Sequence, residues 1–195
     1  MDECEAAARG AGVETTVRPL AISNERPLVP DITALILEDH ELLRRRFAAL
    51  DDVTDSESLT VLWQELSALL DVHAACEEEV FYPELLHRHT EDGEDEAEDA
   101  IDDHNKIRDA VRETANFPVG SHEWWEAVGR ARTENSKHIA EEEREALPDF
   151  RHAATRDARE RLAVRWTRWR LSHQPPRAVD TSDKDADEYI SAHTS

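Results

Sequence analysis

The string HAACEEE at residues 73–79 has an echo, HIAEEE, at residues 138–143. Both strings place a glutamate four residues after a histidine, which in a helix puts the two side chains on one face, roughly 6 Å apart along the axis. Each half of the chain also carries one histidine further upstream, His40 and His104, and each of these follows an aspartate. The offset is 64 residues between the upstream histidines and 65 between the downstream ones. This internal duplication predicts histidines and glutamates at matched depths on four helices.

Apolar residues recur at three- and four-residue steps around these histidines, as they do on the buried face of an amphipathic helix. The first helix is expected to begin after Asp31 and the fourth after Ser121, because both residues are typical N-caps. The second begins near Asp55 or Ser56, and Pro83 is expected to kink or end it. No stretch alternates at period two for long, so no strands are expected. The prediction is an all-α fold, an up-down-up-down four-helix bundle with an added C-terminal helix and disordered termini.

The bundle is expected to span residues 31–151, between segments of different composition. Residues 1–30 lack a sustained apolar period and predict a flexible N-terminal arm. Residues 152–172 contain six arginines and an apolar stripe, and predict a basic amphipathic helix capped by Thr155. We expect this helix to pack on the acidic bundle, the alternative being a membrane surface or a partner. The polar residues 173–195 predict a disordered tail.

The composition excludes several classes of partner. The chain has 195 residues, with 45 Asp and Glu against 23 Lys and Arg, and a net charge of -22. That charge disfavours nucleic acids and anionic membranes. Cys4 and Cys76 predict no disulfide framework, the N-terminus is acidic where a signal peptide is basic, and no apolar run approaches 18 residues. We therefore expect a cytoplasmic protein with no nucleic-acid and no membrane partner.

The helical angle selects one glutamate from each triplet. At 100° per residue, the side chain four positions after a histidine is turned by about 40° from it, and those five and six positions after by about 140° and 240°. Glu78, Glu79 and Glu143 are therefore expected to face solvent. Only the fourth position is a glutamate in both halves, which selects Glu77 and Glu142.

Six polar groups at one depth of a bundle would leave buried carboxylates unpaired, at a cost that bound cations remove. For any single histidine, the alternative is a hydrogen-bonded core residue. Imidazole with carboxylate suits iron, manganese or zinc and excludes a thiolate-rich zinc site. We predict a dinuclear metal site whose ligands are His40, His73, Glu77, His104, His138 and Glu142.

Several neighbours of these ligands invite a functional interpretation. Cys76 is expected to be a small buried core residue rather than a redox thiol. Asp39 and Asp103 are turned by about 100° from the histidines that follow them, so flanking positions are expected rather than hydrogen bonds to the imidazoles. Tyr82 lies nine residues after His73 and is expected on the far face of the helix.

The order of the six ligand types resembles the haemerythrin-like family and its HHE cation-binding motifs. The signatures of the second and fourth helices of that family resemble EEEVFYP at residues 77–83 and EEREALP at residues 142–148. The resemblance covers roughly residues 31–151. It implies a non-haem di-iron centre inside a four-helix bundle. By the family pattern, the two histidines of each half hold one iron, and the two glutamates bridge the irons.

One position departs from the pattern of the oxygen-carrying haemerythrins, which have a fifth histidine one turn after the third-helix ligand. Here that place is Arg108, so the resemblance implies an extra open iron position. The leading hypothesis is a protein that binds a small oxidant or gas (O₂, NO or peroxide) there, in sensing or stress handling. The alternatives are a catalase-like, peroxide-decomposing di-iron enzyme and a metal-dependent regulatory or iron-holding module.

Overall fold

The computed structural model describes residues 30–88, 92–173 and 179–194. Within these ranges the fold is all-helical and contains no strand, as predicted. Apart from Pro30, the arm predicted at the N-terminus lies outside the described residues.

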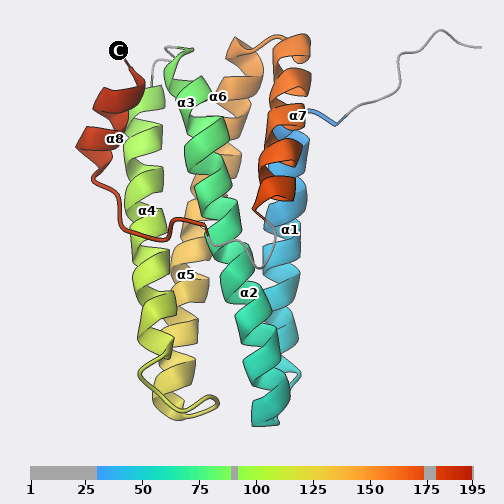
Figure 1. The fold of residues 1–195 in the computed structure, drawn as a ribbon, viewed down its shortest axis with the longest axis vertical. Helices are drawn as coiled ribbons and strands as arrows, with labels where there is room; N and C mark the ends of the chain where they lie inside the picture. The colour runs from blue at the N-terminus through green and yellow to red at the C-terminus, as the bar shows by residue number, and fades with distance from the viewer. Residues whose placement is uncertain (1–29, 89–91, 174–178, 195) are drawn as a thin grey trace, which may run out of the picture.

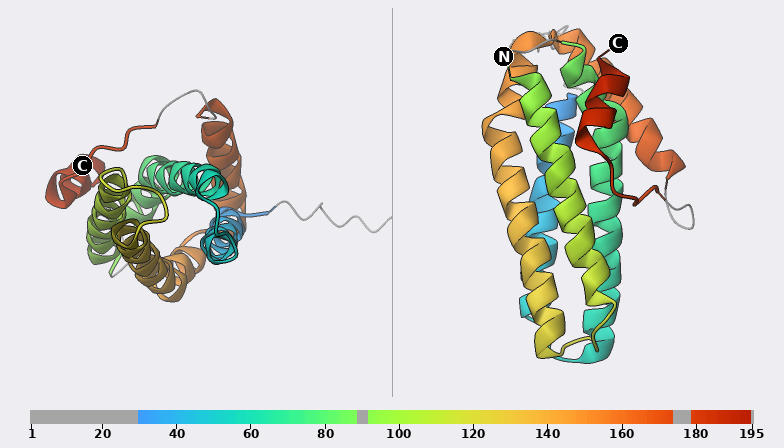
Figure 2. Two further views of the ribbon diagram at one scale, coloured as in Figure 1. Left: turned by 90° about the horizontal axis from the view of Figure 1, so that it is seen from below. Right: turned by 90° about the vertical axis from the view of Figure 1, so that its left-hand side faces the viewer.

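The four longest described helices lie side by side along the long axis of the molecule (Figure 1). Helix α1 packs on α2 and α4 on α5, while contacts between α1 and α5 and between α2 and α4 close the ring that Figure 2 shows end-on. Their bounds are α1 (Ile32–Asp51), α2 (Ser56–Cys76), α4 (Gly93–Thr114) and α5 (His122–Arg144).

Two apolar clusters fill the interior of this ring, and a polar layer separates them. Along α1, His40 follows Ile36 of the first cluster and precedes Leu43 of the second. All three side chains are fully buried. The histidine is therefore held in place by apolar packing on both sides, which positions the polar layer at a fixed depth.

The predicted helix starts are confirmed by their N-caps. The side chains of Asp31, Asp55 and Ser121 accept hydrogen bonds from backbone N–H groups in the first turns of α1, α2 and α5. Such caps satisfy donors that a helix leaves free, and each contributes about 1 kcal/mol. Gly120, directly before the cap of α5, has φ +84°, a conformation that favours glycine.

The kink predicted at Pro83 takes the form of a π-helical turn just before the proline. Helix α2 continues into η1 (Glu77–Phe81) and then into α3 (Tyr82–Leu86). The backbone N–H of Tyr82 donates to the carbonyl of Glu77, five residues back instead of four. The wider turn contains one extra residue and so rotates all that follows by about 100° relative to a regular helix.

The two halves of the duplication differ at this point. In the second half, α5 ends at Arg144 and α6 (Ala146–Ala153) follows after a break at Glu145, whose φ and ψ are -121° and -84°. Pro148 lies in the first turn of α6, where a missing backbone N–H is tolerated.

The predicted basic helix is α7 (Arg156–Ser172), and it packs against α1, α2 and η1 of the bundle, as expected. Thr155 caps it, and Trp166 is 2% exposed. Its arginines form ion pairs with acidic residues of the bundle, including Arg159 with Asp31 at 3.0 Å. None of the described helices has both the length and the apolar character needed to cross a membrane.

The disordered tail predicted for residues 173–195 is wrong for the described residues 179–194. A segment without regular structure runs alongside the bundle and leads into α8 (Ala186–His193), which packs on α4 and α3 (Figure 2). Asp185 caps α8, and Tyr189 is only 8% exposed. The tail is placed by contacts with residues far away in the sequence, which its polar composition does not reveal.

Candidate metal centre

The six predicted ligands converge in the polar layer between the two apolar clusters. Each is at most 4% exposed. They come from all four sides of the ring: His40 from α1, His73 from α2, Glu77 from η1, His104 from α4, and His138 and Glu142 from α5.

The carboxylate of Glu77 lies between two pairs of histidines. Its Oε1 atom is 3.1 Å from Nε2 of His73 and 3.8 Å from Nε2 of His40. Its Oε2 atom is 3.3 Å from Nε2 of His104 and 3.8 Å from Nε2 of His138. Each pair together with Glu77 offers ligand atoms that all lie within 4.8 Å of one another. One carboxylate thus presents one oxygen to each pair, as a bridging ligand does.

Glu142 occupies a less symmetric position than Glu77. Its Oε2 atom lies 3.1 Å from Nε2 of His40, while its Oε1 atom accepts a hydrogen bond of 3.1 Å from the hydroxyl of Tyr82. Glu142 belongs to neither of the two ligand groups that Glu77 shares. The second glutamate therefore contacts one histidine, His40, and a phenol.

The prediction that Tyr82 lies on the far face is wrong. Nine regular residues after His73 would turn it by about 180°, and the π-helical turn between them removes about 100° of that rotation. Tyr82 is consequently buried and bonded to Glu142. Burial, reinforced by the charges of Glu142 and Glu77, raises the pKa of the phenol well above its usual range, so the hydroxyl keeps its proton.

Many polar atoms at the centre are buried without a hydrogen-bond partner in the described structure. They are Nε2 of His40, both ring nitrogens of His73, both carboxylate oxygens of Glu77 and Oε2 of Glu142. Buried polar groups are rarely left unpaired, because each costs about 1–3 kcal/mol. A bound cation satisfies lone pairs that point at a common centre. The residues present therefore fit a metal site.

Carboxylates from other helices accept hydrogen bonds from two of the imidazoles, at the ring nitrogen that faces away from the centre. Nδ1 of His40 donates to Glu143 at 3.0 Å, and Arg44 donates to the same carboxylate oxygen at 2.9 Å. We call these three residues the exposed triad, because the side chains of Glu143 and Arg44 are 27% and 44% exposed. An ionised carboxylate only accepts hydrogen bonds, so Nδ1 carries a proton and Nε2 is the nitrogen that faces the centre.

The second half of the duplication repeats this arrangement. Nδ1 of His104 donates to Glu78 at 2.8 Å, and Arg108 donates to the same oxygen at 2.6 Å. We call these three residues the buried triad, because the side chains of Glu78 and Arg108 are 0% and 2% exposed. In the second half, as in the first, the outer contacts leave Nε2 available for a metal ion.

The expectation that Glu78 and Glu143 face solvent is wrong, whereas Glu79 is exposed as predicted. A glutamate turned by about 140° from the histidine of its own helix points toward the next helix, where it meets the other half's histidine. The duplication held a signal for this, because an arginine follows His40 and His104 by four residues in both halves.

The flanking residues keep to the positions predicted for them. Asp103 pairs with Lys106 and Lys137 rather than with an imidazole. Asp39 lies 3.6 Å from Nδ1 of His73, beyond hydrogen-bond distance. Cys76 is fully buried in the core, and burial raises the pKa of its thiol, so no thiolate is available to a metal.

The charge balance of the centre points to a cation. Burial lowers the pKa of His40, but the carboxylates of Glu142 and Glu77 outweigh burial and raise the pKa to about 10. Burial likewise opposes protonation of His104, and Glu77 with Glu78 raises its pKa to about 9. The protons on these two imidazoles thus balance the negative charge of the buried carboxylates. A bound metal ion would balance the same charge.

A cavity of about 30 Å³ lies between α4 and α5 and is lined by Tyr82, His138 and Glu142. This volume is enough for one or two molecules the size of water. The lining contains no lysine or arginine, and its other members are Ala100, Ala146 and the acids Glu96, Asp99, Asp103, Glu141 and Glu145. A wall of this charge admits cations and neutral molecules more readily than anions.

Comparison with known proteins gives one match. A family model described as the hemerythrin HHE cation binding domain matches residues 31–150. No curated protein and no solved structure matches the chain. The matched residues contain the four long helices and all six predicted ligands, whereas α7 and α8 lie beyond them.

Proposed function

The chain belongs to the hemerythrin HHE cation-binding family, and we propose that its up-down-up-down bundle holds two non-haem iron ions and binds a small oxidant or gas there. Candidate ligands are O₂, NO and peroxide, in sensing or stress handling. The proposal rests on one observation. Two buried pairs of histidines, His40 with His73 and His104 with His138, share the carboxylate of Glu77.

The assignment of ligands follows the contacts of the buried side chains. His40 and His73 would hold one ion, His104 and His138 the other, and Glu77 would bridge the two through its separate oxygens. Glu142 would complete the first site through Oε2. Manganese and zinc accept the same ligand types, and iron is the metal typical of the family. Iron held by imidazole and carboxylate supplies reversible one-electron chemistry and exchangeable ligand positions.

Arg108 leaves room for an added ligand. It stands where oxygen-carrying relatives have a fifth histidine, yet its guanidinium is turned to Glu78 in the buried triad. The cavity beside His138 and Tyr82 supplies a space of suitable size next to the second histidine pair. The hydroxyl of Tyr82, which donates its proton to Glu142, borders this space, and the acidic lining disfavours anions.

Tyr82 also favours a second candidate function, the disproportionation of peroxide to water and oxygen. The hydrogen bond from the buried Tyr82 hydroxyl would position the carboxylate of Glu142 to take a proton from one peroxide oxygen and to return it to the other. Iron-loaded protein that fails to release oxygen from peroxide would exclude this candidate.

Metal analysis with optical spectroscopy tests the proposed function. Full-length protein expressed with iron available should contain about two irons per chain. Its near-ultraviolet bands should change when air, azide or peroxide is added. His73→Ala should lose iron, because it removes one of the ligands on which the first site depends. One zinc per chain, or a His73→Ala protein that still holds two irons, would contradict the proposal.

A further inference from the structure

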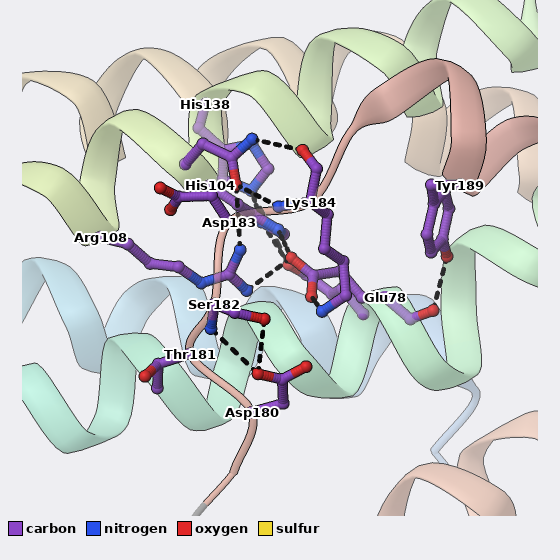
Figure 3. A network of polar contacts seen from close by, with 12 residues as sticks. Glu78, His104, Arg108, His138, Asp180, Thr181, Ser182, Asp183, Lys184 and Tyr189 are labelled. Carbon is purple, nitrogen blue, oxygen red and sulfur yellow. Dashed lines mark hydrogen bonds and ion pairs between the residues drawn. The ribbon is translucent and has the colours of Figure 1, made fainter.

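We propose that the C-terminal strap, residues 180–189, supports the metal centre. Lys184 is a positioning residue, because its ammonium group orients Glu78 and Glu78 in turn orients His104. This inference rests on the proposed iron pair and concerns how one half of it is supported. The strap lies beyond the residues that the family model matches. Figure 3 shows it crossing the bundle directly over the buried triad.

The first argument is the way in which Glu78 divides its two carboxylate oxygens. Oε1 accepts hydrogen bonds from His104 and Arg108, both on α4. Oε2 pairs with the ammonium group of Lys184 from the strap (Figure 3). The carboxylate that orients His104 is therefore held from one side by the bundle and from the other by the C-terminal segment.

The second argument is that the strap is fastened next to the ligand itself. Asn105, the residue after His104, donates to the backbone carbonyl of Lys184 at 2.7 Å and accepts from its backbone N–H at 3.0 Å. Two turns further along α4, Arg112 donates to the carbonyl of Thr181 at 3.1 Å and to Asp183 at 2.6 Å. These contacts fix the backbone on which Lys184 is carried, so its ammonium group is delivered to a defined place.

The third argument comes from the π-helical turn. The N–H of Tyr82 donates to Glu77, so the carbonyl of Glu78 lacks the donor that a regular helix would give it. Pro83 follows and has no N–H to offer in its place. Tyr189 of the strap supplies the missing donor, because its hydroxyl binds the carbonyl of Glu78 at 2.5 Å. The strap thus satisfies both the side chain and the backbone of Glu78.

The strap supports only one of the two histidine pairs. In the exposed triad, the equivalent carboxylate of Glu143 binds His40 and Arg44, and its described contacts include no residue of the strap. Loss of Lys184 would leave Oε2 of Glu78 buried without its cation, which loosens His104 and leaves His40 untouched. Removal of the direct outer partner of a metal-binding histidine, here Glu78, typically weakens metal binding by about 10–100-fold, so loss of Lys184, one contact further out, should weaken it by about 10-fold or less.

The experiment uses full-length Lys184→Met loaded with ferrous iron. Release of iron to a chelator is measured together with the Mössbauer spectrum. One iron of the two should bind more weakly, by about 10-fold or less, with an altered spectrum, while the other keeps its wild-type behaviour. Lys184→Arg should restore both readouts, because the cation returns. Lys106→Met is the matched control, since Lys106 also pairs with a buried carboxylate but that carboxylate is Asp103, which binds no imidazole in the described structure.

Tyr189→Phe provides an independent test that keeps the packing of the ring. It should shift the same iron in the same direction by a smaller factor, because it removes only the hydrogen bond to the backbone of Glu78. Wild-type iron affinity and spectrum in both Lys184→Met and Tyr189→Phe would overturn the inference while leaving the proposed function intact. A wild-type protein without an iron pair would overturn both.

Discussion

The exposed triad and the buried triad contain the same residue types at equivalent positions of the duplication, but they lie in different surroundings. The carboxylate is 27% exposed in the first and 0% in the second. Solvent and salt screen the first, whereas the low dielectric around the second strengthens its contacts and makes a lost partner expensive. The duplication therefore sets which groups meet, and the C-terminal segment determines how strongly one set is held.

The largest effect is expected from the residue that the two halves share. Glu77→Ala should lose both irons, because each carboxylate oxygen of Glu77 faces one histidine pair. Glu142→Ala should retain the iron of His104 and His138, since Glu142 approaches His40 on the other side. Iron content per chain distinguishes these outcomes. Equal iron loss in the two variants would show that the glutamates act symmetrically.

The arginines of the two triads provide the next comparison, through the free energy of unfolding of metal-free protein. Arg108→Met should reduce this free energy by about 3 kcal/mol, because it breaks a buried ion pair. Arg44→Met should reduce it by less than about 1 kcal/mol, because its pair is solvent-exposed. Urea denaturation of both variants measures the difference. Equal losses would mean that burial does not distinguish the triads.

The pH dependence of the metal-free protein sharpens the same comparison. The pKa values of His40 and His104 are raised above 6.5, to about 10 and about 9. Their charged forms therefore stabilise the fold fully below pH 6.5, and that stability is lost as the pH rises through 9 and then 10. Nitrogen NMR of the imidazoles should show His104 losing its proton first. Titration of both near pH 6.5 would contradict the charge balance described for the centre.

Iron binding should release protons for the same reason. At pH 8, His40 and His104 carry protons that a metal ion must displace. Isothermal calorimetry in buffers of different ionisation enthalpy measures the number released, and affinity should increase with pH up to about 10. Binding without proton release would show that these histidines are not ligands.

The smallest expected effect concerns the cavity beside His138. Asp99→Asn and Glu141→Gln should each speed the binding of azide by a few-fold, because each removes a negative charge from the cavity lining. The binding of neutral NO should not change, and high salt should reduce the difference for azide. Stopped-flow absorbance of the iron-loaded protein measures both rates. Equal acceleration of azide and NO would indicate a steric effect instead of an electrostatic one.

The sequence was sufficient to predict the helices of the bundle, the basic helix α7 and the convergence of the six polar side chains. Helical spacing and N-cap chemistry are local, so residues such as Asp31 and Ser121 mark helix starts without knowledge of the fold. The duplication then placed the histidines at matched depths, which the positions of His40 and His104 bear out.

What the sequence did not reveal depends on contacts between elements. A fixed angle of 100° per residue misplaced Tyr82, because the π-helical turn changes the register. The same rule correctly turned Glu78 away from His73, the histidine that precedes it in the sequence. It could not show that Glu78 contacts His104 on another helix. The tail looked disordered because the partner of Lys184 and Tyr189 lies more than 100 residues earlier in the chain.

Magnetic measurement of the iron-loaded, full-length protein tests the central claim most directly, that one buried carboxylate joins two metal sites. If Glu77 bridges two irons, the spins of the oxidised pair are coupled and the magnetic moment per iron falls on cooling. Two irons whose moments follow the behaviour of isolated ions, or a single iron per chain, would contradict the account.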